Sequence, residues 1–82
     1  MYYVYILKSI NFPEIIYAGS TSDVQSRLDV HNSGGSVYTK DYKPWKLLWQ
    51  SQFEDKLQVL EFEKYLKSHS GRAFMHKRLL SL

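Results

Sequence analysis

Residues 2–19 of this 82-residue chain have the sequence YYVYILKSINFPEIIYAG, in which two apolar runs flank a polar turn. The first run, at residues 2–7, is made of β-branched, aromatic and aliphatic residues, which favour a β-strand. Asn11 and Pro13 are typical turn residues, and residues 15–19 predict a second short strand. We expect the two strands to pair as an antiparallel hairpin.

The pattern changes to that of a helix directly after the hairpin. Ser22 and Gln25 have the spacing of a capping box, which predicts a helix start at Ser22. Val24 and Leu28 supply an i, i+4 apolar pair for one face of this helix. The Gly-Gly pair at residues 34–35 is expected to end it.

A third strand is predicted after the polar loop at residues 33–43. Pro44 suits the start of a strand, where its missing N–H costs no ladder hydrogen bond. Large apolar residues then alternate along the chain, at Trp45, Leu47, Trp49 and Phe53.

Two helices are predicted in the remainder of the chain. The acidic pair at residues 54–55 suits the positive end of a helix that extends to about Ser68. Residues 70–71, Ser-Gly, are expected to break the chain before a last short helix over residues 73–80. The predicted order is β-β-α-β-α-α, an α+β fold with a three-stranded antiparallel sheet flanked by helices.

Composition indicates one folded domain over residues 1–82. Hydrophobic residues make up 44% of the chain, including seven Tyr, four Phe and two Trp, which is too apolar for a disordered chain. There is no cysteine, which excludes disulfides and thiolate metal sites. The longest apolar run is too short to span a bilayer, and no signal-peptide pattern opens the chain, so a cytoplasmic protein is expected.

Positive charge is concentrated at the C-terminal end of the chain. Residues 1–63 carry six basic and eight acidic side chains, whereas residues 64–82 carry five basic side chains and no acidic one. Such a segment either contacts phosphates or forms an ordinary solvated helix face. The candidate nucleic-acid contacts are Lys40, Lys43, Lys64, Lys67, Arg72, Lys77 and Arg78.

Two tyrosines on the predicted hairpin are candidates for catalysis. If the pairing register places Tyr5 and Tyr17 on one face, their hydroxyls converge on one spot and could orient or deprotonate a water molecule. Ordinary aromatic packing across the strands is the alternative. Gly19 ends the second strand, where a missing side chain lets backbone or ligand approach closely.

Arg27 and His31 are four residues apart on the first predicted helix and therefore share a face. The helix N-terminus that precedes them, at Thr21 and Ser22, is a natural anion site. Two structural alternatives stay open: an exposed ion pair between Arg27 and Asp23, and a His31 that only complements the helix dipole in the last turn.

The second predicted helix has an apolar stripe of Val59, Phe62 and Leu66. On a helical wheel Glu63 lies about 70° from the centre of that stripe, and Glu61 lies about 130° away. A carboxylate so close to buried surface must be paired, hydrogen-bonded or metal-bound to stay ionised.

Two interpretations of Glu63 follow. It is the best carboxylate in the chain for a hard divalent cation such as Mg²⁺, which often takes only one or two protein carboxylates and keeps its waters. The alternative is an i, i+4 ion pair with Lys67 at the rim of the core.

These residues together resemble the GIY-YIG nuclease family, over nearly the whole chain. The residues of the first motif lie where the family carries Gly-Ile-Tyr, and those of the second where it carries Tyr-Ile-Gly. The later segments are similar to the family's arginine-bearing helix, connecting loop, third strand and metal-binding helix. The matching segments are residues 3–7, 17–21, 22–28 with 31–34, 38–40 with 43–47, and 61–67.

The resemblance is closest to the small stand-alone bacterial members, which are similar to the N-terminal nuclease domain of the excision-repair protein UvrC. It implies that Tyr5 or Tyr17 handles the attacking water, Arg27 steadies the phosphate and His31 assists proton transfer. It also implies that Glu63 holds a single Mg²⁺ or Mn²⁺ ion. Family members often carry an Asn after the metal helix, whereas the last asparagine here is Asn32, at the exit of the first helix.

The function implied is a metal-dependent endonuclease acting on DNA or RNA, DNA being favoured, in repair or processing. A second hypothesis is a nucleic-acid-binding module with lost or weak cleavage, in which the basic segment holds phosphates and Tyr38, Tyr42 and Trp45 stack on bases. A third is a protein-interaction domain that uses exposed aromatics.

Overall fold

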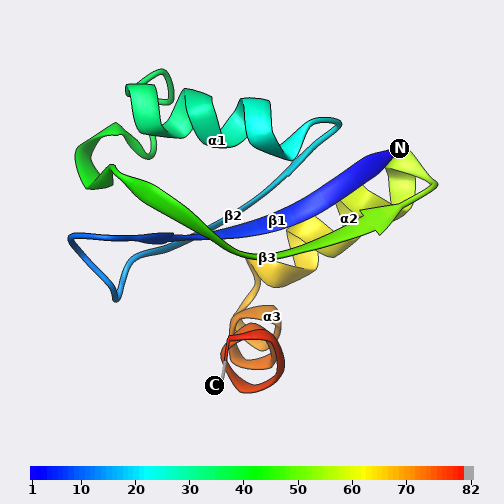
Figure 1. The fold of residues 1–82 in the computed structure, drawn as a ribbon. Helices are drawn as coiled ribbons and strands as arrows, with labels where there is room; N and C mark the ends of the chain where they lie inside the picture. Colours follow the sequence, from blue (N-terminus) through cyan, green and yellow to red (C-terminus); the bar gives the residue numbers. More distant parts are fainter. Residues whose placement is uncertain (81–82) are drawn as a thin grey trace.

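The computed structural model describes residues 1–80 as an α+β domain built on a three-stranded antiparallel sheet. The strands are β1 (Tyr2–Ser9), β2 (Ile16–Thr21) and β3 (Trp45–Phe53), arranged in the order β2-β1-β3. This confirms the predicted fold class and the predicted hairpin (Figure 1). No helix within the described part of the chain is long and apolar enough to cross a membrane.

Helices cover both faces of the sheet, with α1 on one side and α2 and α3 on the other (Figure 1). The elements are α1 (Val24–Ser33), a 3₁₀ turn (Lys40–Tyr42), α2 (Lys56–Leu66), α3 (His69–Phe74) and a π-helical turn (Met75–Leu79). The element order agrees with the predicted β-β-α-β-α-α.

The central strand β1 contributes to two cores. Tyr5 and Leu7 point to the α1 face, while Val4 and Ile6 point to the face covered by α2 and α3. All four side chains are buried, because successive residues of a strand face opposite sides and both sides of β1 are covered.

A β-bulge divides β3 between the two cores. Ile6 pairs with Trp49 but Leu7 pairs with Leu47, so one extra residue of β3 is accommodated at this point. Trp45 and Leu47 therefore pack on the α1 face, whereas Trp49 and Phe53 pack on the opposite face. The predicted strand is confirmed, but its apolar residues do not share one face, because a one-residue shift reverses the side on which side chains point.

The helix α1 begins one residue later than the predicted capping box. The N-cap is Asp23, whose carboxylate accepts hydrogen bonds from the Ser26 backbone N–H (3.1 Å) and the Ser26 hydroxyl (2.9 Å). An ionised carboxylate is a strong acceptor at the positive end of a helix, which favours Asp23 over Ser22 as the cap. The predicted C-terminal stop is confirmed: Gly34 adopts the left-handed conformation with φ 85°.

The C-terminal helix begins before the predicted break. Ser68 caps α3 by accepting a hydrogen bond from the Gly71 N–H at 3.0 Å, so residues 70–71 lie inside this helix. A Cβ placed on Gly71 would lie 1.6 Å from the backbone oxygen of Tyr65. The glycine is therefore required by the close approach of α3 to the end of α2, and does not end a helix.

We expect Gly71→Ala to lower the free energy of unfolding by about 1–3 kcal/mol, because α3 would have to move away from the Tyr65 carbonyl. Urea unfolding followed by circular dichroism measures this. Ser70→Ala is the matched control, since Ser70 is exposed in the same helix and should leave the midpoint nearly unchanged. Equal midpoints for the two variants would contradict the assigned role of Gly71.

Candidate active site at the edge of the sheet

The two candidate tyrosines share the α1 face of the sheet. In the β1–β2 register Tyr5 pairs with Gly19 and Leu7 pairs with Tyr17, so Tyr5 and Tyr17 are diagonal neighbours on one face. Their ring centroids are 6.4 Å apart. The two rings therefore share one face of the hairpin, which is the arrangement that convergence of their hydroxyls requires.

Gly19 leaves room for the ring of Tyr5. A Cβ on Gly19 would lie 2.5 Å from the Tyr5 hydroxyl oxygen and 3.1 Å from a ring carbon of Tyr17. The close approach expected at this glycine is thus made by a side chain of the site itself, which lies across the bare backbone of β2.

His31 joins the tyrosines from α1. Its side chain is fully buried, its Nε2 is 3.0 Å from the Tyr5 hydroxyl, and its ring centroid is 5.0 Å from that of Tyr17. The other ring nitrogen, Nδ1, is 2.7 Å from the hydroxyl of Thr39, which is also fully buried. His31 therefore belongs to a buried hydrogen-bonded chain, and does more than complement the helix dipole.

Thr39 was not among the residues predicted to form the site. It lies in the loop between α1 and β3, and its side chain contacts His31 from a position eight residues further along the chain. Its backbone oxygen accepts a hydrogen bond from the indole N–H of Trp45 at 3.0 Å. The sequence offered one signal for Thr39, its position in residues 38–40, which resemble the connecting loop of the family. That position does not reveal that its hydroxyl is buried.

Burial and charge set the protonation states of this chain. Burial lowers the pKa of His31 below 6.5, and the positive charge of Arg27 lowers it further, so the imidazole is neutral at neutral pH. Burial raises the pKa of Tyr5 above 10.0, an effect that a hydrogen bond from Arg27 partly offsets. A neutral imidazole can accept a proton at Nε2 while it donates one from Nδ1 to Thr39.

The lowered pKa of His31 predicts a pH-dependent stability. Between the folded-state pKa and 6.5 the unfolded chain binds more protons, so the free energy of unfolding should fall as the pH falls through 6.5. The lowered pKa of Glu63 makes stability depend on pH only below the ordinary glutamate pKa of 4.5. A comparison of pH 7.5 with about pH 5.5 therefore isolates the contribution of the His31 imidazole. Urea midpoints that move equally in wild type and His31→Gln would contradict this prediction.

Arg27 is half-buried on α1, and its guanidinium lies close enough to lower the pKa of both Tyr5 and His31. The alternative of an Arg27–Asp23 ion pair is not realised in residues 1–80, since the Asp23 carboxylate caps α1 through Ser26. The predicted common face of Arg27 and His31 is thus directed at the tyrosines.

Glu63 lies at the same sheet edge but is held from α2. One carboxylate oxygen accepts a hydrogen bond from the Ser20 hydroxyl at 2.5 Å, and the other forms an ion pair with Lys67 at 2.8 Å. Burial by itself raises the pKa of Glu63, but the hydrogen bonds from Lys67 and Ser20 outweigh it and hold that pKa below 4.5. The carboxylate is therefore ionised, and the predicted structural pairing with Lys67 is present.

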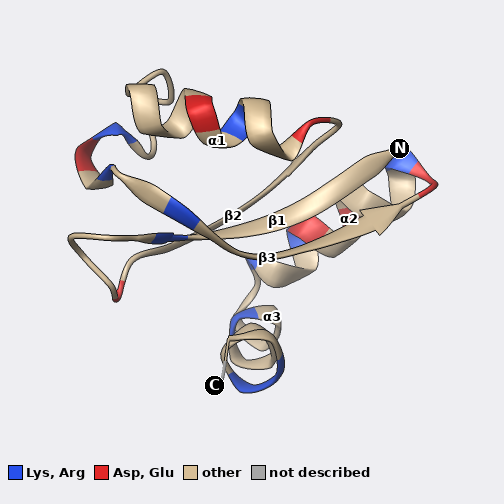
Figure 2. Ribbon diagram, in the orientation of Figure 1, with Lys and Arg blue, Asp and Glu red and all other residues tan. Residues whose placement is uncertain are grey.

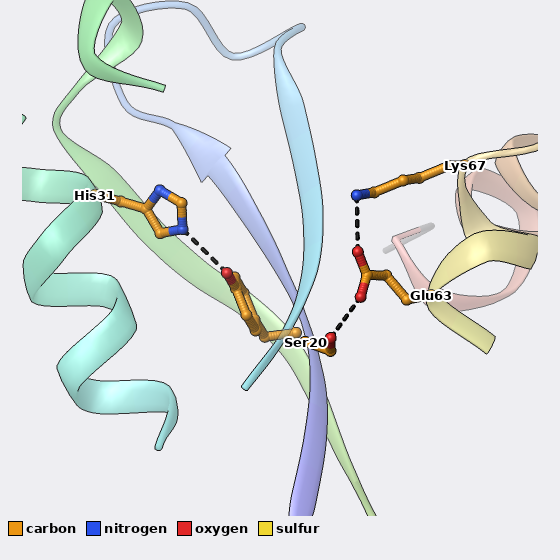
Figure 3. A network of polar contacts seen from close by, with 5 residues as sticks. Ser20, His31, Glu63 and Lys67 are labelled. Carbon is orange, nitrogen blue, oxygen red and sulfur yellow. Dashed lines mark hydrogen bonds and ion pairs between the residues drawn. The ribbon is translucent and has the colours of Figure 1, made fainter. Parts of the chain in front are cut away.

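Strand β2 separates the two halves of the site. Figure 3 shows His31 on one side of β2 and Glu63 with Lys67 on the other, and Ser20 reaches Glu63 from the strand itself. Because β2 is an edge strand, the halves meet around its free edge. There the Lys67 ammonium lies 5.5 Å from the centroid of the Tyr17 ring.

The donor set at Glu63 fits a hard divalent cation. An ionised carboxylate beside a hydroxyl suits Mg²⁺ or Mn²⁺, which can keep most of its water ligands. Within residues 1–80 no group of three or more His, Cys, Asp or Glu side chains surrounds a common point. A cation at Glu63 would take the place of the Lys67 ammonium on one carboxylate oxygen.

The candidate nucleic-acid contacts fall into two groups. Lys40 and Lys43 lie in the loop before β3, whereas the others lie on α2, at its C-cap, on α3 and on the π-helical turn, on the far side of the sheet (Figure 2). Of these, Lys67 and Arg72 line a common hollow. The other members of the second group are Lys64, Lys77 and Arg78.

The aromatic residues expected to stack on bases differ in their availability. Trp45 is buried in the core, so it is not available for stacking, and this part of the expectation is wrong. Its indole is held by Thr39 and packs beside Tyr17. Tyr42 is 36% exposed and makes an edge-to-face ring contact with Phe12, whereas Tyr38 is 83% exposed.

Asn32 has a structural role at the exit of α1. Its side-chain oxygen accepts a hydrogen bond from the backbone N–H of Trp45 (2.5 Å), and its amide donates to the Trp45 carbonyl (3.1 Å). This two-point contact fixes the start of β3 against α1. With both groups of its amide engaged, Asn32 is not directed at the tyrosines or at Glu63.

The fold and the site geometry agree with a comparison to known domains. A family model described as the GIY-YIG catalytic domain matches residues 1–78, and the chain belongs to this family. Because GIY-YIG domains form an endonuclease superfamily, the family supports a nuclease-type function with nucleic acid as the general class of substrate.

More particularly, the chain is similar to small bacterial proteins named UPF0213. It is 40% identical to one from Clostridium perfringens over 68 residues, which is 82% of this chain and 71% of that protein. It is 37% identical to one from Lactococcus lactis over 82 residues, covering 99% of this chain and 73% of the relative. The solution NMR structure of a UPF0213 protein from Bacillus halodurans is 31% identical, with a TM-score of 0.55, over 94% of this chain and 84% of that one.

Proposed function

We propose that this protein is a divalent-metal-dependent endonuclease that hydrolyses phosphodiester bonds of DNA, in repair or processing. The observation that carries the proposal is the hydrogen bond between the Tyr5 hydroxyl and a neutral, buried His31, with Arg27 beside it. A phenol whose proton can pass to an imidazole, next to a fixed positive charge, suits proton abstraction near a phosphate.

The proposed reaction divides the work among five side chains. Tyr17 borders the open hollow and orients the attacking water, and Tyr5 accepts the proton of this water while its own proton passes to Nε2 of His31. The water oxygen forms a bond to phosphorus as the bond to the leaving oxygen breaks. Arg27 stabilises the negative charge that grows on the phosphate oxygens, and Glu63 holds the metal ion. An ion held by the Glu63 carboxylate would supply further positive charge to stabilise the developing negative charge.

Thr39 acts in this scheme as a positioning residue. Its hydroxyl at Nδ1 fixes the orientation of the imidazole, so that Nε2 faces Tyr5. Both side chains are fully buried and hydrogen-bonded to each other, so the pair is set before substrate arrives.

The test is a nicking assay on supercoiled plasmid, with Mg²⁺ or Mn²⁺ and with EDTA as the control. The proposal expects relaxed plasmid only in the presence of metal. Single-stranded DNA, branched DNA and RNA are tested in parallel, since each presents the same phosphodiester chemistry. Absence of metal-dependent cleavage on every one of these substrates would overturn the proposal.

A second candidate function is a nucleic-acid-binding module without cleavage. The observation that favours it is the Lys67–Glu63 ion pair, which together with Ser20 already satisfies both oxygens of the carboxylate. A binding module predicts salt-sensitive binding of nucleic acid in EDTA and no cleavage of plasmid in the nicking assay.

A further inference from the structure

The free edge of β2 borders a hollow of about 520 Å³. Its lining combines an aromatic ring from the loop after α1 with two cations, one at the C-cap of α2 and one on α3, and Tyr17 of the candidate site forms part of its wall. The lining residues are Ile16, Tyr17, Ala18, Tyr38, Lys67 and Arg72.

We propose that this hollow binds one unpaired nucleotide of a single-stranded nucleic acid, with the base stacked on Tyr38 and a phosphate bound by Arg72. This inference rests on the proposed function only in taking nucleic acid as the substrate. It adds the place where the strand enters and the strand form that fits there.

The first argument is that Tyr38 is a free stacking surface on a fixed loop. Tyr38 is 83% exposed, and its ring makes no ring contact within residues 1–80. Its neighbour Thr39 is fully buried and is held by His31 and by the indole of Trp45. Because this loop is already anchored, presenting the Tyr38 ring to a base costs little additional ordering.

The second argument is charge. Arg72 is exposed and forms no ion pair with an acidic side chain within residues 1–80. Lys67 is paired with Glu63, which leaves Arg72 as the unneutralised cation in the lining of the hollow. A guanidinium in that position suits a phosphate oxygen pair.

The third argument concerns the form of the strand. Bases of a duplex are stacked on one another and cannot offer a face to Tyr38, whereas unpaired bases can. The volume of about 520 Å³ lies within the range of sites for small molecules, which suits a single nucleotide. Tyr17 belongs both to the wall of the hollow and to the candidate active site, so the bound nucleotide would lie next to the phosphate to be cut.

The test measures binding of a labelled oligodeoxythymidine by fluorescence anisotropy, in EDTA so that no cleavage occurs. Tyr38→Ala is expected to weaken binding by about 5- to 100-fold, the range found for loss of one base stack, while Tyr38→Phe keeps wild-type affinity. Val37→Ala is the control for truncation in the same exposed loop. Affinity for a duplex of the same length should be equal in wild type and Tyr38→Ala.

The phosphate contact has its own readout. Arg72→Gln should reduce the slope of log affinity against log salt by about 0.7, the value for one phosphate contact of a single strand. Lys56→Gln also removes one positive charge, but at the start of α2 and outside the lining of the hollow. It should leave the slope of log affinity against log salt unchanged. An oligouridine of the same length, run in parallel, compares RNA with DNA: loss of affinity of Tyr38→Ala for either of the two oligonucleotides supports the subsite.

Unchanged affinity of Tyr38→Ala for both strands would overturn the inference, as would an equal loss for single-stranded and duplex DNA. These outcomes are independent of catalysis. A protein that binds through Tyr38 but never cuts would leave the subsite in place and refute the nuclease. If the protein cuts nucleic acid but Tyr38→Ala binds with wild-type affinity, only the subsite is refuted.

Discussion

Glu63→Gln is expected to reduce metal-dependent nicking of supercoiled plasmid by about 100-fold or more. The substitution keeps a group that can accept the hydrogen bond from Ser20 but removes the charge that would hold Mg²⁺ or Mn²⁺. Calorimetric titration with Mn²⁺ gives a second readout, in which wild type should bind and the variant should not.

Glu61→Gln is the matched control for this prediction. Glu61 is exposed on the same helix and forms no ion pair within residues 1–80, so its variant should cut and bind metal as wild type does. Urea unfolding of both variants verifies that α2 remains packed. A Glu63→Gln protein with wild-type nicking and wild-type Mn²⁺ affinity would refute the assigned metal ligand.

The Lys67–Glu63 ion pair makes the calorimetry informative even if cleavage is absent. If the ammonium outcompetes the metal ion, wild type will show no Mn²⁺ binding, and the binding-module function is favoured. If the metal ion displaces the ammonium, Lys67 is released beside Tyr17, in the wall of the hollow that Arg72 also lines.

Arg27→Ala is expected to lower the nicking rate by about 100- to 1,000-fold, the usual loss on removing one group that stabilises developing charge. It should also raise the pKa of Tyr5 further, because the Arg27 guanidinium now lowers it by hydrogen bonding and by its charge. The tyrosine pKa is measured by NMR titration of the labelled ring. The upward direction follows because removing a positive charge destabilises the phenolate.

Gln25→Ala is the control substitution on α1. Gln25 lies on the exposed face of this helix, where its side chain donates a hydrogen bond to Asp29, and its variant should cut at the wild-type rate. Arg27→Lys separates charge from shape: it keeps the positive charge but loses the planar, two-point geometry, so we expect partial activity. Nicking by Arg27→Ala at the wild-type rate, together with an unmoved Tyr5 pKa, would remove Arg27 from the site.

The hairpin, the first helix with its glycine stop, the third strand and the apolar stripe of α2 were all predictable from the sequence. Each of these depends on residues that are close together in the chain, where periodicity and cap residues act directly. Glu63 is a good example: its angle to the stripe of Val59 and Leu66 placed it at the rim of the core, where it is found half-buried.

The site residues named from the motifs also come together: Tyr5, Tyr17 and His31 touch, and Arg27 acts on two of them. Their shared face depended on the strand register, which the tyrosine positions alone left open. The partners that complete the site, Thr39 and Ser20, could not be found in this way, because a lone hydroxyl residue carries no periodic or spacing signal.

Only the tertiary structure decided the remaining features. The bulge opposite Ile6 reversed the faces of Trp49 and Phe53, and the contact between α2 and α3 gave Gly71 its role. Each of these features depends on a contact between two segments that are distant in the chain. The free energy of that contact comes from packing and hydrogen bonds that neither segment makes alone. The sequence by itself therefore determined the order of the elements and was enough to select the candidate site residues, while tertiary packing decided register, close approaches and the hydrogen-bond partners of the site.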